Sequence, residues 1–260
     1  MQNQQLTTPP RRNYIKEFRA LGDLALMPGY LLAAEIAKGG QVDKTTPVLL
    51  IPGIGGGDRV MAPFKRYLKT AGYNCYGWNM GVNLAGLNLE FDKSELTWDI
   101  DPSLENNGEL GVPYLCDKMV ERTKQISEET GSPVAIIGWS LGGCIAREVA
   151  RDIPDLVKCV VTLGTPVQGG PKYTSASTRL SKKGLDMDWI EQEVKKRDQK
   201  PITRPITAIV SKSDGVVGYN ATIDNVSTNV EHIDTNISHM GMVFNKQAWN
   251  ITRAALDACD

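Results

Sequence analysis

The sequence lacks a strong imbalance of charge. Its 260 residues carry 29 Lys and Arg against 30 Asp and Glu, which gives a net charge of −1. A protein that binds nucleic acid usually presents a clustered basic face. The one basic cluster, at residues 195–197, lies in a helical pattern that also carries Glu191 and Glu193. We therefore interpret it as a solvated helix face and expect no nucleic acid partner.

Cysteine and histidine are also scarce. The five cysteines are odd in number and far apart, and none stands at Cys-x-x-Cys or metal-site spacing. The acidic stretch at residues 89–111 has neither the oxygen spacing nor the central glycine of a calcium loop. We therefore expect free thiols, no metal and no cofactor.

Long apolar runs are absent as well. The N-terminus shows no positive start followed by an apolar core, so no secretory signal is visible. No apolar run has the ~20 residues that a membrane-spanning helix needs. Together with the unpaired cysteines, this predicts a cytoplasmic protein. A chain of this length can bury one full core, and we expect one large domain.

An apolar segment precedes the first predicted strand. Between residues 14 and 37 apolar side chains recur at helical spacing, and the Pro-Gly pair at 28–29 divides the pattern into two predicted helices. This N-terminal helical segment, residues 1–43, could touch a membrane surface as a hairpin, pack on its own domain, or form the interface of a homodimer. We favour packing against protein, because Asp23 and Glu35 interrupt the apolar face.

From residue 44 onward, strand patterns alternate with helix patterns. Short apolar runs predict strands at 47–51, 134–138, 156–164 and 205–210. The segment at 73–78 predicts a further strand, and alternating residues at 229–233 predict the last one. Helical periodicity predicts helices at 60–70, 113–130, 188–197 and 247–259, with another directly after Ser140. The alternation implies an α/β domain at 44–260, with a mainly parallel central sheet flanked by helices on both faces.

Two segments interrupt this alternation. The first is an acidic insertion at about 89–111, in which Phe91 and Trp98 would supply an apolar anchor. The second, at about 171–204, separates two core strands and carries a short helical pattern. We interpret the second segment as a small lid, which predicts a fairly open cleft.

The clearest motif follows the strand at 134–138. Residues 138–142, Gly-Trp-Ser-Leu-Gly, fit Gly-x-Ser-x-Gly, in which glycines flank a serine because a sharp strand-to-helix turn leaves no room for side chains beside it. Such a turn holds the hydroxyl of Ser140 at the carboxyl end of the sheet. The motif therefore predicts a nucleophilic serine.

A serine hydroxyl is a poor nucleophile until a base takes its proton, and that base needs a group that fixes its tautomer. Of the two histidines, His232 lies inside the last predicted strand, whereas His239 lies in the loop beyond it, so we select His239. Asp214 comes just after the strand at 205–210 and is our candidate for the acid. The competing carboxylates lie further into a loop or in the last strand: Asp224, Glu231 and Asp234. The order Ser, Asp, His is that of α/β-hydrolases.

An acyl-transfer intermediate carries an oxyanion, which backbone N–H groups must stabilise. One donor should be the amide of Leu141, directly after the serine. The other should come from the glycine-rich loop at residues 52–57, where Ile54 is the best candidate. This loop is not a dinucleotide site, because Asp58 stands where Gly-x-Gly-x-x-Gly needs its last glycine.

These motifs together resemble those of the α/β-hydrolase superfamily, in particular its lipase and esterase branch. The similar motifs are Pro-Gly-Ile-Gly-Gly at 52–56, Gly-Trp-Ser-Leu-Gly-Gly at 138–143, Thr-Leu-Gly-Thr-Pro at 162–166, Asp-Gly-Val-Val at 214–217 and Ser-His-Met-Gly at 238–241. Pro52 replaces the histidine that is usual in the first of them. The loop at 77–84 resembles bacterial members whose substrates are mostly undefined. The likeness covers roughly residues 44–257.

The sequence therefore predicts a serine hydrolase that cleaves carboxylic esters through an acyl-enzyme intermediate. A small-molecule ester with a short to medium acyl chain is the expected substrate. A thioesterase or an acyltransferase would use the same catalytic triad, and a binding module can keep a hydrolase fold without its chemistry. These alternatives stay open at this point.

Overall fold

The computed structural model describes residues 5–37, 44–101, 103–105 and 108–259. Its centre is a six-stranded sheet in the order β2-β1-β3-β4-β5-β6, and every neighbouring pair of strands is parallel. The strands are β1 (Pro47–Ile51), β2 (Asn74–Gly77), β3 (Val134–Trp139), β4 (Val157–Leu163), β5 (Ile206–Ser211) and β6 (Val230–Thr235). The predicted sheet is confirmed, and each strand lies within two residues of its expected bounds.

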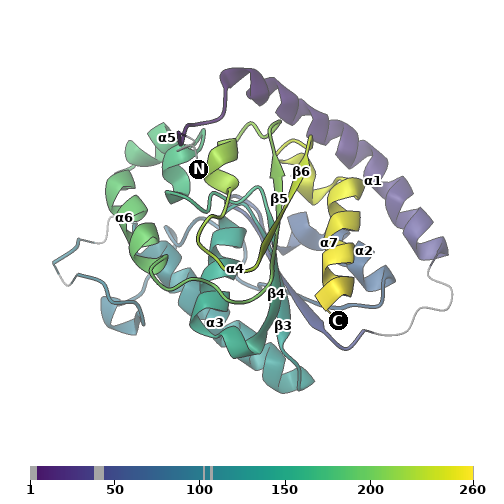
Figure 1. Cartoon of the computed structure of the whole chain (residues 1–260), viewed down its shortest axis with the longest axis horizontal. Helices are drawn as coiled ribbons and strands as arrows, with labels where there is room; N and C mark the ends of the chain where they lie inside the picture. Colours follow the sequence, from purple (N-terminus) through teal and green to yellow (C-terminus); the bar gives the residue numbers. More distant parts are fainter. Residues whose placement is uncertain (1–4, 38–43, 102, 106–107, 260) are drawn as a thin grey trace.

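Helices cover both faces of this sheet (Figure 1). One face carries α3 (Gly111–Thr130) and α4 (Leu141–Asp152), and the other carries α2 (Asp58–Thr70) and α7 (Lys246–Cys259). A further helix, α1 (Arg19–Ile36), packs on α2 and α7 from outside. Residues alternate along each strand, so β1 gives Val48 and Leu50 to the α2 and α7 side and Leu49 and Ile51 to the α3 and α4 side. The sheet therefore divides two apolar cores.

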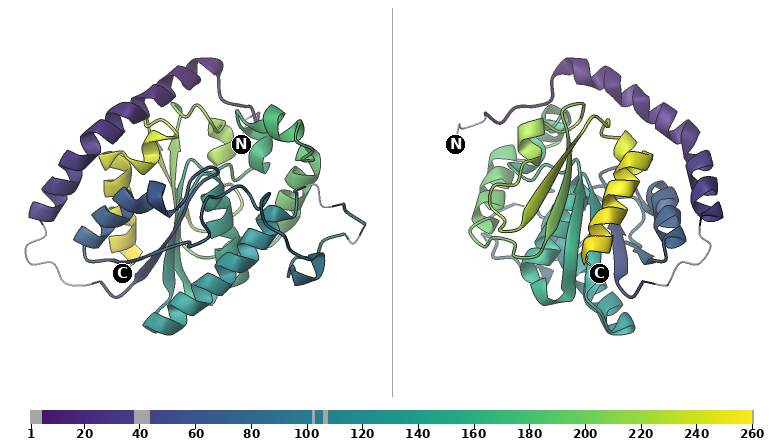
Figure 2. Two further views of the ribbon diagram at one scale, coloured as in Figure 1. Left: turned by 180° about the vertical axis from the view of Figure 1, so that it is seen from behind. Right: turned by 45° about the vertical axis from the view of Figure 1, so that its right-hand side comes forward.

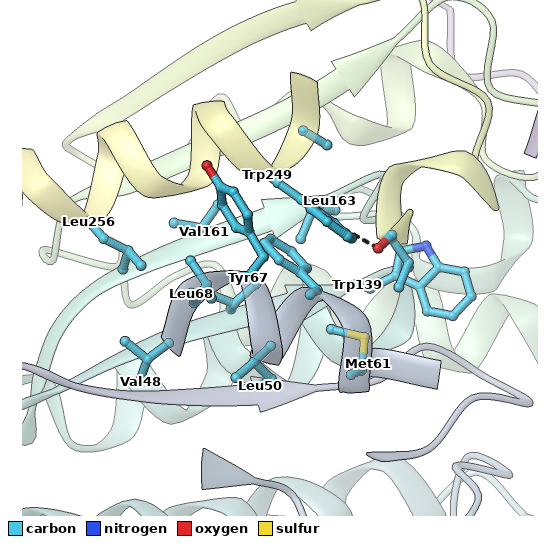
Figure 3. Packing of buried hydrophobic residues seen from close by; sticks show 14 of the residues in the cluster. Val48, Leu50, Met61, Tyr67, Leu68, Trp139, Val161, Leu163, Trp249 and Leu256 are labelled. Carbon is cyan, nitrogen blue, oxygen red and sulfur yellow. Dashed lines mark hydrogen bonds between the residues drawn. The ribbon is translucent and has the colours of Figure 1, made fainter. Parts of the chain in front are cut away.

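The core beneath α2 and α7 is built around aromatic rings (Figure 3). Trp249 is fully buried, stacks on Phe64 with ring centroids 5.6 Å apart, and donates its indole N–H to Val243 O at 2.8 Å. Tyr67 packs against the same indole at 5.2 Å. Because Trp249 meets both its packing and its hydrogen-bonding needs, it anchors the last helix on the sheet.

The N-terminal segment differs from the prediction of two helices. A 3₁₀ helix, η1 (Arg11–Phe18), leads into α1, which runs without a break through Pro28. Contacts on both sides of the proline explain this: Asp23 accepts from Asn245 Nδ2 at 2.7 Å, and Glu35 accepts from Arg66 Nε at 2.7 Å. These contacts offset the hydrogen bond that a proline removes from a helix. The predicted division into two helices at residues 28–29 is therefore wrong.

The two interrupting segments lie on the side of the sheet that carries α3 and α4. In the acidic insertion, Phe91 stacks on Tyr114 at 4.2 Å, and the Arg197 guanidinium lies 4.3 Å from the centre of the Trp98 ring. The segment at 171–204 contains α5 (Ser177–Ser181) and α6 (Met187–Arg197), which lie outside α4 (Figure 2). The expected apolar anchors of the insertion are therefore packed against helices.

No described helix is both long enough and apolar enough to cross a membrane. Among the described residues, no group of three or more His, Cys, Asp or Glu side chains is arranged to hold a metal ion.

Candidate active site

Ser140 lies at the sharp turn between β3 and α4. Its φ of 54° and ψ of −122° are rare for a residue with a side chain, and its N–H donates to Leu163 O at 2.8 Å. The flanking glycines are required by close approach: a Cβ on Gly138 would lie 2.4 Å from Gly142 O, and one on Gly142 would lie 2.2 Å from Ile51 O. The strained serine is thus held by contacts on both sides, as in a nucleophile elbow.

His239 and Asp214 lie together beyond the ends of β6 and β5. His239 Nδ1 is 2.7 Å from Asp214 Oδ2, and both side chains are almost completely buried. The other carboxylate oxygen, Asp214 Oδ1, accepts from Val216 N and Val217 N, each at 2.7 Å. With Oδ1 taken up by the backbone, Oδ2 is left facing the imidazole.

A ring contact joins this pair to the serine turn. Trp139, the residue before Ser140, donates its indole N–H to His239 O at 3.2 Å, and the two rings lie 5.7 Å apart. The carboxyl ends of β3, β5 and β6 thus bring the three predicted residues to one edge of the sheet.

The charge around His239 changes its proton affinity. Burial lowers the pKa of the imidazole, but the Asp214 carboxylate beside it and the more distant Glu17 carboxylate outweigh this effect. The pKa of His239 is therefore raised above its ordinary value. Such an imidazole accepts a proton readily when a reaction delivers one.

The competing residues have other partners. Asp224 forms a buried ion pair with Arg147 of α4, and its backbone N–H donates to His232 Nε2 at 2.9 Å. Asp234, at the end of β6, accepts from the Tyr219 hydroxyl at 2.9 Å. Asp214 is therefore the carboxylate that contacts His239. His232 instead accepts a hydrogen bond from the backbone N–H of Asp224.

The glycine-rich loop after β1 lies directly against the serine turn. A Cβ on Gly53 would be 2.9 Å from Ser140 Cβ, so only glycine allows this approach. Ile54 and Leu141, the two candidate oxyanion donors, line one cavity together with Ser140. This is the arrangement in which two backbone N–H groups could face an oxygen bound at Ser140.

Asn83 is a residue of this site that sequence reasoning missed. It is fully buried and holds the glycine-rich loop at three points: its side-chain Nδ2 donates to Pro52 O at 2.8 Å, its N–H donates to Gly56 O at 2.7 Å, and its carbonyl accepts from Gly55 N at 2.7 Å. The signal that could have found it is an asparagine within the family-like loop at 77–84.

Asp58, noted in the sequence only for excluding a dinucleotide site, also ties the two loops together. Its carboxylate accepts from Trp78 N and Asn79 N, both at 3.1 Å. The loop after β2 therefore supports the loop after β1 at two places.

Ser140 lines an apolar cavity of about 170 Å³. The cavity extends along α4 beneath α5 and α6, and Trp98 of the acidic insertion closes part of its wall. Side chains from α5, α6 and the loop between them supply part of its apolar lining: Leu180, Leu185, Trp189, Ile190 and Val194. Side chains of the segment at 171–204 thus form part of the cavity wall.

The architecture and the turn at Ser140 together define the class: the chain has the α/β-hydrolase fold. A family model described as the alpha/beta hydrolase fold matches residues 117–221, which include β3, the serine turn and Asp214. The resemblance noted in the sequence is confirmed at this level. A search of curated proteins found no match to the chain.

Solved structures share this fold at low sequence identity. An alpha/beta superfamily hydrolase from Oenococcus oeni aligns over 84% of this chain and 94% of its own, with a TM-score of 0.54 and 16% identity. The lipase BlEst2 of Bacillus licheniformis aligns over 84% of this chain and 94% of its own, with a TM-score of 0.55 and 13% identity. A lipase-esterase related protein of Clostridium acetobutylicum aligns over 84% of this chain and 97% of its own, with a TM-score of 0.54 and 15% identity. Likeness at this identity concerns the fold.

Proposed function

We propose that the protein is a serine hydrolase of carboxylic esters, with Ser140, His239 and Asp214 as its catalytic triad. The observation that carries the proposal is the strained Ser140 in the wall of a cavity, next to Trp139, which contacts a buried His239 whose Nδ1 lies 2.7 Å from Asp214 Oδ2. Several of its structural neighbours are described as lipases or esterases, which agrees with this chemistry.

In the proposed reaction, Ser140 Oγ attacks the ester carbonyl carbon and passes its proton to His239 Nε2. The backbone N–H groups of Ile54 and Leu141 stabilise the oxyanion that forms. The tetrahedral intermediate then collapses, the protonated imidazole gives its proton to the departing alcohol, and the acyl group remains on Ser140. Water, deprotonated by the same imidazole, releases the acid and restores the serine.

The cavity suggests what the acyl group is. Its exposed wall is mostly apolar, and its volume of about 170 Å³ lies below the ~300–1,000 Å³ of pockets for drug-sized ligands. An apolar acyl chain of short to medium length suits such a space. A thioester could enter the same cavity, and thiol release would then replace alcohol release in the first step.

The test is labelling with a fluorophosphonate probe together with hydrolysis of p-nitrophenyl esters of graded chain length. Ser140→Ala should abolish labelling and lower kcat by about 10⁴-fold or more, because it removes the nucleophile. Ser238→Ala, which changes another buried serine near the site, is the matched control and should still be labelled. Labelling that survives Ser140→Ala, or no ester hydrolysis by the native protein, would contradict the proposal.

A further inference from the structure

The N-terminal helix reaches the site through Glu17, a residue outside every motif. Glu17 Oε1 accepts from Gly215 N at 2.7 Å and from His239 N at 2.9 Å, while Oε2 accepts from Met240 N at 2.9 Å. One carboxylate therefore binds the backbone of both loops that carry the acid and the base.

Asn13, one turn earlier, binds the first of these loops from a neighbouring direction. Its side chain is buried, and Nδ2 donates to Lys212 O at 2.9 Å and to Asp214 O at 3.0 Å. The fit between the segments is close, since a Cβ on Gly215 would lie 2.7 Å from Asn13 O. The backbone on either side of the Asp214 side chain is thus held by η1.

From these contacts we infer that Glu17 is a positioning residue, which sets the Asp214 and His239 loops at their mutual distance and places negative charge behind the imidazolium that forms during turnover. The inference rests on the proposed function only for the kinetic part of its test. Because three charge-assisted hydrogen bonds converge on one side chain, its removal should loosen both loops together.

Other charges near His239 do not replace that of Glu17. Asp214 faces the imidazole directly. Lys16 donates to Ser213 Oγ at 3.3 Å, and Asp23, whose pKa burial raises, accepts from Asn245 near the turn after His239. With Asp214 unchanged, loss of the Glu17 charge removes one of the influences that raise the pKa of His239, so this pKa should fall.

The test compares Glu17→Gln with Glu35→Gln, which removes a carboxylate from α1, the next helix, away from the site. Glu17→Gln should lower kcat by about tenfold and move the acid limb of the kcat/KM profile to lower pH by about half a unit. Glu17→Asp keeps the charge on a shorter side chain. Its acid limb in the kcat/KM profile should therefore lie nearer to that of the native protein than the limb of Glu17→Gln does. Glu35→Gln should change neither quantity.

A second measurement does not depend on turnover. The chain has only two histidines, so NMR titration of the imidazoles, with His232→Gln to assign them, follows His239 directly. A lowered His239 pKa in Glu17→Gln supports the inference even if no ester substrate is found. If His239 titrates as in the native protein while only the melting temperature falls, Glu17 is merely structural and the inference is overturned.

The outer face of the same helix carries an independent feature. Large apolar side chains that are more than half exposed follow one another along η1 and α1: Ile15, Phe18, Leu21, Leu26, Leu32 and Ile36. No other described element covers this side, and α1 runs along the outside of the molecule (Figures 1 and 2). A contiguous apolar face of this extent is typical of an interaction surface.

The charges of this segment are sorted between its two faces. Its three acidic residues, Glu17, Asp23 and Glu35, are all bound to the body of the protein, to the site loops, Asn245 and Arg66 respectively. Arginine, by contrast, is exposed at positions 11, 12 and 19. The outer face is therefore apolar along its length and positive at its N-terminal end.

We propose that this face docks on an anionic lipid surface, with α1 lying in the plane of the headgroups. Its 18 residues span about 27 Å, and apolar side chains facing lipid with arginines at one end are typical of interfacial helices. A second copy of the chain would offer the arginines no acidic residue from this segment, whereas anionic headgroups would offer each of them a phosphate.

Vesicle co-sedimentation of the full chain tests this. Binding to vesicles of phosphatidylcholine with phosphatidylglycerol should be at least about tenfold tighter than to phosphatidylcholine alone, and should weaken at high salt. Leu21→Gln with Leu32→Gln should lower the affinity about tenfold or more, and Val226→Gln, an exposed apolar residue elsewhere, should leave it unchanged.

Sedimentation velocity tests the alternative that a second copy of the chain covers this face. A monomer that binds anionic vesicles supports the proposal. If no vesicle composition is bound, the proposal is overturned, and a dimer that Leu21→Gln with Leu32→Gln dissociates would then assign the face to a second copy.

Discussion

Asp214→Asn should lower kcat for ester hydrolysis by about 10⁴-fold. In the native protein Oδ1 is taken by Val216 N and Val217 N. The asparagine would keep its oxygen on these donors and turn its NH₂ toward His239 Nδ1. The imidazole would then accept at Nδ1 and carry its proton at Nε2, so it could no longer take the proton of Ser140.

The effect should be one of chemistry, with little loss of folding. The substitution preserves shape and the two backbone contacts, so the melting temperature should change by only a few degrees. Asp234→Asn is the matched control, because it changes a carboxylate bonded to Tyr219 at the end of the last strand. It should keep near-native kcat. An Asp214→Asn variant that retained kcat within tenfold would show that another group orients the base.

Asp224→Asn should have the opposite profile, a large loss of stability with little loss of turnover by the folded enzyme. The Asp224–Arg147 pair is buried and connects α4 to the loop before β6. Removing the Asp224 charge leaves the Arg147 guanidinium buried without its partner, which lowers the free energy of unfolding by about 3 kcal/mol. Urea unfolding should measure this loss, and kcat per folded molecule should stay within about threefold.

The pH dependence of stability gives a separate test of this pair. Burial raises the pKa of Asp224, but Arg147 and the N–H groups of Ser227 and Val226 outweigh it and lower the pKa to about 2. An unfolded aspartate has a pKa of about 3.9. The pair therefore stabilises the native protein above about pH 4, and this contribution is lost as the pH falls toward 2.

In the Asp224→Asn variant, the loss of stability that this pair causes as the pH falls from about 4 toward 2 should disappear. Arg147→Met combined with Asp224→Asn should be more stable than Asp224→Asn alone, since no unpaired charge is left inside. If Asp224→Asn instead abolished turnover without loss of stability, Asp224 and not Asp214 would be the acid.

Local patterns were sufficient to predict the sheet and the turn at Ser140. Most strands are short apolar runs, the last strand alternates, and most of the bends that follow carry their own glycines, so residues close in sequence determine both. Asp214 and His239 could be selected for the same reason, since each follows a strand whose carboxyl end points to the same edge of the sheet.

Residues that act through distant contacts could not be predicted in this way. Glu17 lies in a segment whose composition gives no sign of the loops that it holds, because its partners are separated from it by up to 223 residues. Asn83 could be noticed only as part of a family-like loop, since Pro52 O, which its side chain binds, lies 31 residues away. The continuity of α1 through Pro28 has the same cause, since contacts with other helices override the local preference of proline. Tertiary contacts, rather than sequence period, decide these features.

The attachment of η1 to the site bears on how the chain can be shortened. A fragment beginning at residue 44 would retain every family-like motif, the whole sheet and all three candidate catalytic residues. It would nevertheless lose the carboxylate that binds Gly215, His239 and Met240, and with it the amide that binds the Asp214 backbone. The smallest fragment that carries the complete site must therefore begin before Asn13, in a stretch that no motif marks.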